Sequence, residues 1–205
     1  MPCKHRFYHV LDPQTDNLEY LFIGTFNPEW DAENDNNAQY FYGRFTNDFW
    51  SLLPQTFGDP SLTGKSVTEW IAYCNTRKIG ITDLVREITN ADKGVPDHYR
   101  LITEGYADNN LDKKYGNAYV FTIHFNTDVI KTIIERNILS LKGVFFTRKT
   151  GTGIPRIWAE WQKVCEHCNH HHVRYSELIT PSGNGRRHKD RMAQWKKTIL
   201  PGILK

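Results

Sequence analysis

The sequence predicts an α/β fold, specifically a three-layer α/β/α sandwich around a short, mostly parallel, four-stranded central sheet. Two observations predict it. Four short runs of the chain are almost uniformly apolar or β-branched, as expected for parallel strands that are covered on both faces. Segments with helical apolar spacing separate these runs, and strands that alternate with helices favour a parallel sheet.

The predicted elements follow in chain order. The four strands are 19–24 (EYLFIG), 77–84 (RKIGITDL), 142–147 (KGVFFT) and 173–180 (VRYSELIT). Helical spacing predicts helices within 46–57, 64–77, 126–139, 154–165 and 189–199. We expect Thr46 to cap the first of these helices, because a hydroxyl at that position can accept from an exposed backbone N–H. The stretch 107–125 has no pattern that identifies its form.

Length and composition set the class of protein. The chain has 205 residues, which suits one domain over 1–205. It has no signal-peptide pattern, and no apolar run is long enough to span a membrane. Its 4 cysteines are scattered, which favours reduced thiols in the cytoplasm. The basic run at 183–197 (GNGRRHKDRMAQWKK) indicates either a face that meets an anion or a solvated helix end.

Three segments near strand ends carry candidate chemistry, because ligands of open α/β sheets bind beyond the carboxyl ends of the strands. In GTFNP (24–28), Asn27 could hold a water, although a simple Asx-turn is the alternative. In TPSGNGRR (180–187), a hydroxyl, exposed N–H groups and two arginines suit a phosphate, although the loop could merely cap the last helix. Aromatic residues in QYFYGRFTNDFW (39–50) could stack on a flat ring or pack into the core.

These segments together resemble the uracil-DNA glycosylase superfamily, and most closely its mismatch-specific uracil/thymine-DNA glycosylase branch. That branch has a Gly-Ile-Asn-Pro-Gly loop, a Phe-Ala-His-Pro-x-Asn-x-Phe-Trp segment, a Gly-Val/Ile-Thr-x-Leu-Val strand and an Asn-Pro-Ser-Gly-x-x-Arg loop. The counterparts here, in the same order, are GTFNP (24–28), YGRFTNDFW (42–50), GITDLV (80–85) and TPSGNGR (180–186).

The resemblance implies a monofunctional DNA glycosylase of base excision repair. Such an enzyme flips a nucleotide out of the duplex and hydrolyses its N-glycosidic bond. The expected partner is double-stranded DNA with a deaminated or mismatched base, with uracil opposite guanine as the default and hypoxanthine nearly as plausible. We expect a monomer that needs no cofactor and no metal. The alternative is a superfamily member that binds DNA or a modified base without turnover.

The resemblance also implies roles for individual residues. Asn27 would position the water that attacks C1′. Because GTFNP has one more residue between its glycine and its proline than the family loop, Asn27 could point elsewhere. Thr25, Glu29 or Asp31 would then hold the water. The residues expected to contact the base are Phe26, Phe41 or Tyr42, Asn47 and Thr180, and for Asn47 we favour a helix cap over base contact. The residues expected to contact DNA are Ser182, Gly183, Asn184, Arg186, Arg187, Arg148 and Lys149. Asn184 stands where relatives often carry an apolar wedge.

The sequence also bears on a second class of enzyme and on a possible metal site. A small-molecule nucleotide or phosphoester enzyme would need a Walker-type loop or an organised carboxylate pair, and the sequence has neither. The run CEHCNHHH (165–172) has the Cys-x-x-Cys spacing of Cys165 and Cys168 amid histidines. A zinc site normally needs a second pair of ligands at a familiar distance, so a polar helix end is the favoured interpretation.

Overall fold

A computed structural model describes residues 1–30, 38–104, 106–182 and 188–201. The helices and strands lie, in chain order, at β1 Cys3–Lys4, η1 Tyr8–Val10, β2 Tyr20–Gly24, α1 Phe49–Thr56, α2 Val67–Arg77, β3 Ile79–Asp83, β4 Val85–Ile88, α3 Pro96–Thr103, η3 Asp108–Asn110, β5 Lys114–Tyr115, β6 Ala118–Tyr119, β7 Ile123–Phe125, α4 Thr127–Arg136, β8 Gly143–Phe146, α5 Pro155–His170, β9 Tyr175–Glu177 and α6 His188–Ile199.

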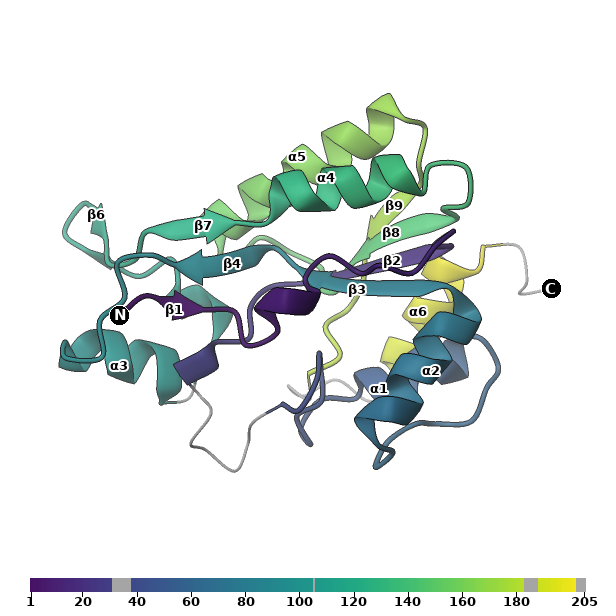
Figure 1. Cartoon of the computed structure of the whole chain (residues 1–205), viewed down its shortest axis with the longest axis horizontal. Helices are drawn as coiled ribbons and strands as arrows, with labels where there is room; N and C mark the ends of the chain where they lie inside the picture. The colour runs from purple at the N-terminus through teal and green to yellow at the C-terminus, as the bar shows by residue number, and fades with distance from the viewer. Residues whose placement is uncertain (31–37, 105, 183–187, 202–205) are drawn as a thin grey trace.

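A parallel four-stranded sheet stands at the centre, in the order β3-β2-β8-β9 (Figure 1). The register pairs Leu21 of β2 with Gly80 of β3 on one side and with Val144 of β8 on the other. All four predicted strands are therefore confirmed. Strands β2, β3 and β8 are buried along their whole length, which explains why their sequences lack polar alternation.

Helices cover both faces of this sheet. Alternate residues of a strand point to opposite faces, and Leu21 and Ile23 accordingly belong to a core cluster with α4 and α5. Tyr20 and Phe22 belong to a second cluster with α1, α2 and α6. Figure 1 shows the same division, with α4 and α5 on one side of the sheet and α1, α2 and α6 on the opposite side.

Local sequence signals explain where two of the helices begin. Helix α2 starts with a capping box, in which the Ser66 side chain accepts from the Glu69 backbone N–H while the Glu69 carboxylate accepts from that of Ser66. The expected Thr46 cap of α1 is wrong, because the N-cap position is Asp48. Asn47, one residue before this N-cap, accepts a hydrogen bond from the Phe49 backbone N–H at 2.9 Å, so its side-chain oxygen binds the first turn of α1.

A second, antiparallel sheet was not predicted. Its order is β1-β4-β7, and β4 follows β3 after a single residue, Leu84, so one stretch of chain serves both sheets. The uninterpreted segment 107–125 contains η3, the β5–β6 hairpin and β7. Strands of two or three residues with exposed side chains leave almost no hydrophobic pattern, which is why the sequence did not identify them. Within the described ranges, no helix is long and apolar enough to cross a membrane.

Candidate functional site

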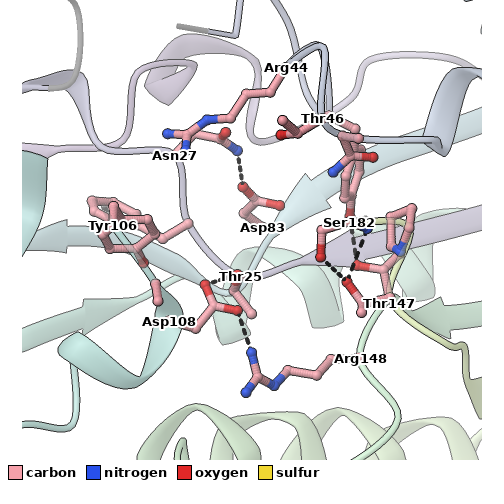
Figure 2. Close-up of a pocket in the computed structure, with 16 residues that line it drawn as sticks. Thr25, Asn27, Arg44, Thr46, Asp83, Tyr106, Asp108, Thr147, Arg148 and Ser182 are labelled. Carbon is pink, nitrogen blue, oxygen red and sulfur yellow. Dashed lines mark hydrogen bonds and ion pairs between the residues drawn. The ribbon is translucent and has the colours of Figure 1, made fainter. Parts of the chain in front are cut away.

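A cavity of about 320 Å³ lies at the carboxyl ends of the parallel strands (Figure 2). This volume is at the lower end of the range of about 300–1,000 Å³ that is typical of small-molecule sites. The described residues that line it are Thr25, Phe26, Asn27, Tyr42, Arg44, Thr46, Asn47, Asp83, Tyr106, Ala107, Asp108, Thr147, Arg148, Thr180, Pro181 and Ser182. The loop after β2 and the loop after β9 thus share one cavity.

Asn27 is held by a buried carboxylate. Its Nδ2 donates to Asp83 Oδ2 at 2.8 Å, and Asp83 is only 1% exposed at the end of β3. Because a carboxylate offers only acceptors, this bond fixes the amide orientation and leaves Asn27 Oδ1 as an acceptor. The backbone is fixed as well, since Arg6 N–H donates to the Asn27 carbonyl at 2.8 Å and Pro28 forms a bridge with His5.

The same Asp83 oxygen accepts a second bond from His5, which is 1% exposed. The His5 Nε2 lies 2.7 Å from Asp83 Oδ2, and the Phe7 backbone N–H donates to His5 Nδ1 at 3.0 Å. Because Nδ1 accepts that bond, the ring proton is on Nε2 and points at Asp83. The site therefore contains a buried His5–Asp83–Asn27 chain of hydrogen bonds.

Gly24 allows this carboxylate to approach the backbone of β2. A Cβ atom at Gly24 would overlap Asp83 Oδ1 and would lie 2.5 Å from the Tyr42 hydroxyl oxygen. The last residue of β2 therefore has to be glycine for Asp83 and Tyr42 to keep these positions.

We expect Gly24→Ala to lower the melting temperature, because overpacking a buried site costs about 1–3 kcal/mol, which corresponds to about 2–12 °C for a chain of this size. Thermal unfolding followed by circular dichroism measures the shift. Gly94→Ala is the matched control, since an added Cβ there would have its nearest neighbour at 3.4 Å. Equal melting temperatures for Gly24→Ala and wild type would contradict the close approach.

A second acid lies across the cavity. Thr25 Oγ1 donates to Asp108 Oδ1 at 2.6 Å, and Arg148 Nη1 donates to Asp108 Oδ2 at 2.7 Å. Burial raises the pKa of the Asp108 carboxyl above its ordinary value, and the nearby Asp83 charge acts in the same direction. The bonds from Thr25 and Arg148 oppose that rise. Both charges of this ion pair are thus partly withdrawn from water at the cavity wall.

Two tyrosines line the cavity, and their hydroxyl groups differ in hydrogen bonding. Tyr42 has a left-handed backbone (φ 57°), and one face of its ring stacks on Phe49 at 4.0 Å with an interplanar angle of 9°. Its hydroxyl lies 3.0 Å from Thr147 Oγ1. The Tyr106 hydroxyl is buried and has no hydrogen-bond partner among the described residues. Burial raises its pKa well above the ordinary value, so the hydroxyl stays protonated.

The loop after β9 is fixed against the start of α1. Ser182 and Asn47 form an isolated bridge, and the Asp48 N–H donates to the Pro181 carbonyl at 2.9 Å. Arg191 of α6, which is 4% exposed, donates to the Ser182 carbonyl at 2.9 Å and pairs with the Asp48 carboxylate. One arginine of the basic run therefore supports the cavity from inside the protein.

Most of the site residues expected from the sequence line this cavity. They are Thr25, Phe26, Asn27, Tyr42, Asn47, Arg148, Thr180 and Ser182. Phe41 does not, because it is fully buried in the cluster under α1, so the choice between Phe41 and Tyr42 falls to Tyr42. Lys149 is exposed and does not line the cavity. Gly183, Asn184, Arg186 and Arg187 lie outside the described residues.

The residues expected as alternative holders of the water are Thr25, Glu29 and Asp31. Thr25 lines the cavity but donates its hydroxyl hydrogen to Asp108. Glu29 Oε1 accepts from the Lys4 backbone N–H at 3.1 Å and does not line this cavity. Asp31 lies outside the described residues. Among the described candidates for holding the water, Asn27 is therefore the residue whose side chain a buried partner, Asp83, orients in the cavity.

Sequence reasoning missed several residues of the site, among them His5, Asp83, Tyr106 and Asp108. Asp83 was detectable in principle, because it follows an apolar strand at the carboxyl edge of the sheet. His5 offered no local signal, since it precedes the first strand of the central sheet. Tyr106 and Asp108 belong to the segment between α3 and β5, whose sequence shows no helical or strand periodicity although Asp108 begins the short helix η3.

The cysteines do not form a cluster with metal-ligand chemistry. Cys165 and Cys168 lie on the buried side of α5 within the core shared with α4, and burial raises the pKa of each thiol to about 12. Among the described residues, the group of His, Cys and acidic side chains whose ligand atoms converge contains no cysteine. The Cys-x-x-Cys spacing places both thiols on the packed side of the helix.

Comparisons with protein-family models, curated proteins and solved structures found no match to this chain. The molecule is therefore characterised by its own fold and site: a mixed α/β protein with a polar, partly ionised cavity at the carboxyl edge of a parallel sheet.

Proposed function

We propose that this chain has the three-layer fold of the uracil-DNA glycosylase superfamily and hydrolyses the N-glycosidic bond of a base flipped out of double-stranded DNA. The observation that carries the proposal is the shared cavity, in which Asn27 after β2 faces the Thr180–Ser182 loop after β9. These are the two segments that the family resemblance places on either side of an everted nucleotide.

The hydrogen bonds around Asn27 suit the orientation of a water. With Nδ2 committed to Asp83, Asn27 Oδ1 can accept a hydrogen from a water and direct its lone pair at C1′. Positioning of this kind supplies a large part of a rate enhancement without a strong base. The rigid loop, fixed through Arg6 and Pro28, keeps the carboxamide aimed.

Asp83 supplies the charge that Asn27 lacks. Loss of a base leaves positive charge on the sugar, and a fixed carboxylate next to that charge stabilises the transition state. Asp83 lies beside Asn27 on the cavity wall, and its hydrogen bonds from Asn27 and His5 hold it in place. The proposed mechanism thus divides two tasks, with Asn27 orienting the water and Asp83 stabilising the sugar cation.

The lining of the cavity suits a flat, polar base. Aromatic rings of Phe26, Tyr42 and Tyr106 line the cavity together with amide and hydroxyl groups of Asn47 and Thr180. These groups fit the hydrogen-bonding edge of a deaminated pyrimidine or purine without selecting one of them.

Phe45 fits the role of a wedge in the duplex. Its side chain is 82% exposed, although it lies in sequence between Arg44 and Thr46, which both line the cavity. An aromatic ring at such a place can fill the gap that the flipped base leaves in the stack. The wedge would then come from the segment before α1, and Asn184 would not need to serve as one.

We expect Phe45→Ala to slow base release from a duplex by about 10- to 100-fold, because stacking on an aromatic residue contributes about 1–3 kcal/mol. Release from a single strand, which has no stack to refill, should change much less. Single-turnover cleavage assays on the two substrates measure the contrast. Leu139→Ala is the matched control, since Leu139 is 101% exposed in the turn between α4 and β8. Equal losses on both substrates would contradict a wedge.

A panel of labelled duplexes tests the proposed function. Each carries one uracil, hypoxanthine, xanthine or mismatched thymine, and abasic sites are scored by alkaline strand cleavage. We expect cleavage of at least one uracil- or hypoxanthine-containing duplex. Salt-sensitive binding without cleavage of any duplex would replace the glycosylase with the non-catalytic DNA-binding alternative, because steep salt dependence marks phosphate contacts alone.

A further inference from the structure

A cluster of three potential metal ligands lies far along the chain from the cavity loops, on helices α4 and α5. His167 and His171 are one helical turn apart, so their rings lie on the same face of the helix at its carboxyl end. Glu135 is near the end of α4, and the two helices pack together. Two different helices therefore contribute to the cluster.

The distances between the ligand atoms suit a small divalent cation. His167 Nε2 lies 3.3 Å from Glu135 Oε1, and His171 Nε2 lies 4.0 Å from the same oxygen. All three atoms lie within 4.8 Å of one another. Tetrahedral zinc with bonds of about 2.0–2.1 Å holds neighbouring ligand atoms about 3.3 Å apart. His167 Nε2 and Glu135 Oε1 already have this spacing. Small rotations of the Glu135 and His171 side chains would shorten the other distances to the same value.

The state of His167 favours a ligand role over a salt bridge. Its Nε2 atom is buried and makes no hydrogen bond within the described residues, although the Glu135 carboxylate faces it. The positive charge of the nearby Lys131 opposes a cation at this place, whereas the negative charge of Glu135 favours one.

We propose that Glu135, His167 and His171 form a zinc-type site that joins α4 to α5, with water completing the coordination. Two imidazoles and one carboxylate are a ligand set that suits zinc. A bound ion would link the ends of the two helices that cover one face of the central sheet. The two buried thiols of the same sequence run take no part in it.

Zinc titration of the untagged, metal-stripped chain tests this proposal. We expect one equivalent of zinc to bind, and a zinc concentration about 100 times Kd to shift the folding equilibrium about 100-fold toward the native state. Thermal unfolding and calorimetric titration measure the two effects. Cobalt should give the visible absorption spectrum of a tetrahedral site.

Four variants distinguish a defined site from adventitious binding by surface histidines. Glu135→Gln and His171→Ala should lose the bound zinc and the thermal shift, and both positions are exposed enough for the variants to fold, with side chains 54% and 25% exposed. His170→Ala and His172→Ala remove exposed neighbours outside the cluster and should bind as wild type does. Equal weakening in all four variants, or no stoichiometric binding by wild type, would overturn the proposal.

Discussion

Asp83→Asn is expected to slow base release by about 100- to 1,000-fold while leaving the protein folded. A unit charge about 4 Å from a developing cation contributes about 4 kcal/mol at an effective dielectric constant of about 20, and about 1.4 kcal/mol changes a rate tenfold. The substitution removes that charge but keeps the shape of the side chain and an oxygen that can accept from Asn27. Single-turnover rates on the best duplex of the panel measure the loss.

Two controls separate lost charge from lost structure. The melting temperature shows whether the hydrogen bonds that Asp83 accepts from His5 and Asn27 survive the substitution, because a buried donor left without a partner costs about 1–3 kcal/mol. Duplex affinity shows whether the DNA-binding surface is intact. A folded Asp83→Asn variant that binds DNA and releases the base at the wild-type rate would contradict the electrostatic role of Asp83.

Asn27→Ala should abolish detectable base release. It removes the only group that the proposed mechanism assigns to the attacking water, and it leaves Asp83 with one donor, His5. Loss of a positioned polar group of this kind costs about 100- to 1,000-fold in rate. Alkaline strand cleavage of a duplex with one U·G pair is the measurement.

The matched control for this variant is Asn169→Ala. Asn169 also donates through its side chain, to the Tyr175 hydroxyl at 3.0 Å, but on the exposed end of α5. We expect the control to cleave as wild type does. If Asn27→Ala also cleaves normally, Asn27 is not catalytic, whatever the family of the chain.

The central sheet could be predicted because its strands are buried along their length. An apolar run such as 142–147 can be recognised as a strand from its own sequence, without knowledge of the strand that it pairs with. The carboxyl ends of parallel strands necessarily lie at one edge of the sheet. From the sequence alone, that rule places the loops after β2 and β9 at the same edge of the sheet. It did not give the order β3-β2-β8-β9, which depends on how the crossovers run.

The remaining parts of the site depend on contacts that leave no local pattern. His5 reaches Asp83 across 78 positions of sequence. Phe41 and Tyr42 are adjacent aromatic residues, and only the left-handed backbone of Tyr42 sends one into the core and the other to the cavity. Asp108 and Tyr106 lie in an irregular segment, and only the folded chain places them opposite Asp83.

The most direct measurement of the central claim is a co-crystal structure with a duplex that carries a non-hydrolysable 2′-fluoro analogue of the substrate nucleotide. The account predicts one everted nucleotide in the 320 Å³ cavity, with C1′ facing Asn27 and Asp83 and the Thr180–Ser182 loop against its phosphates. A duplex bound on another face, or a nucleotide that stays stacked while the cavity holds no part of it, would contradict the account.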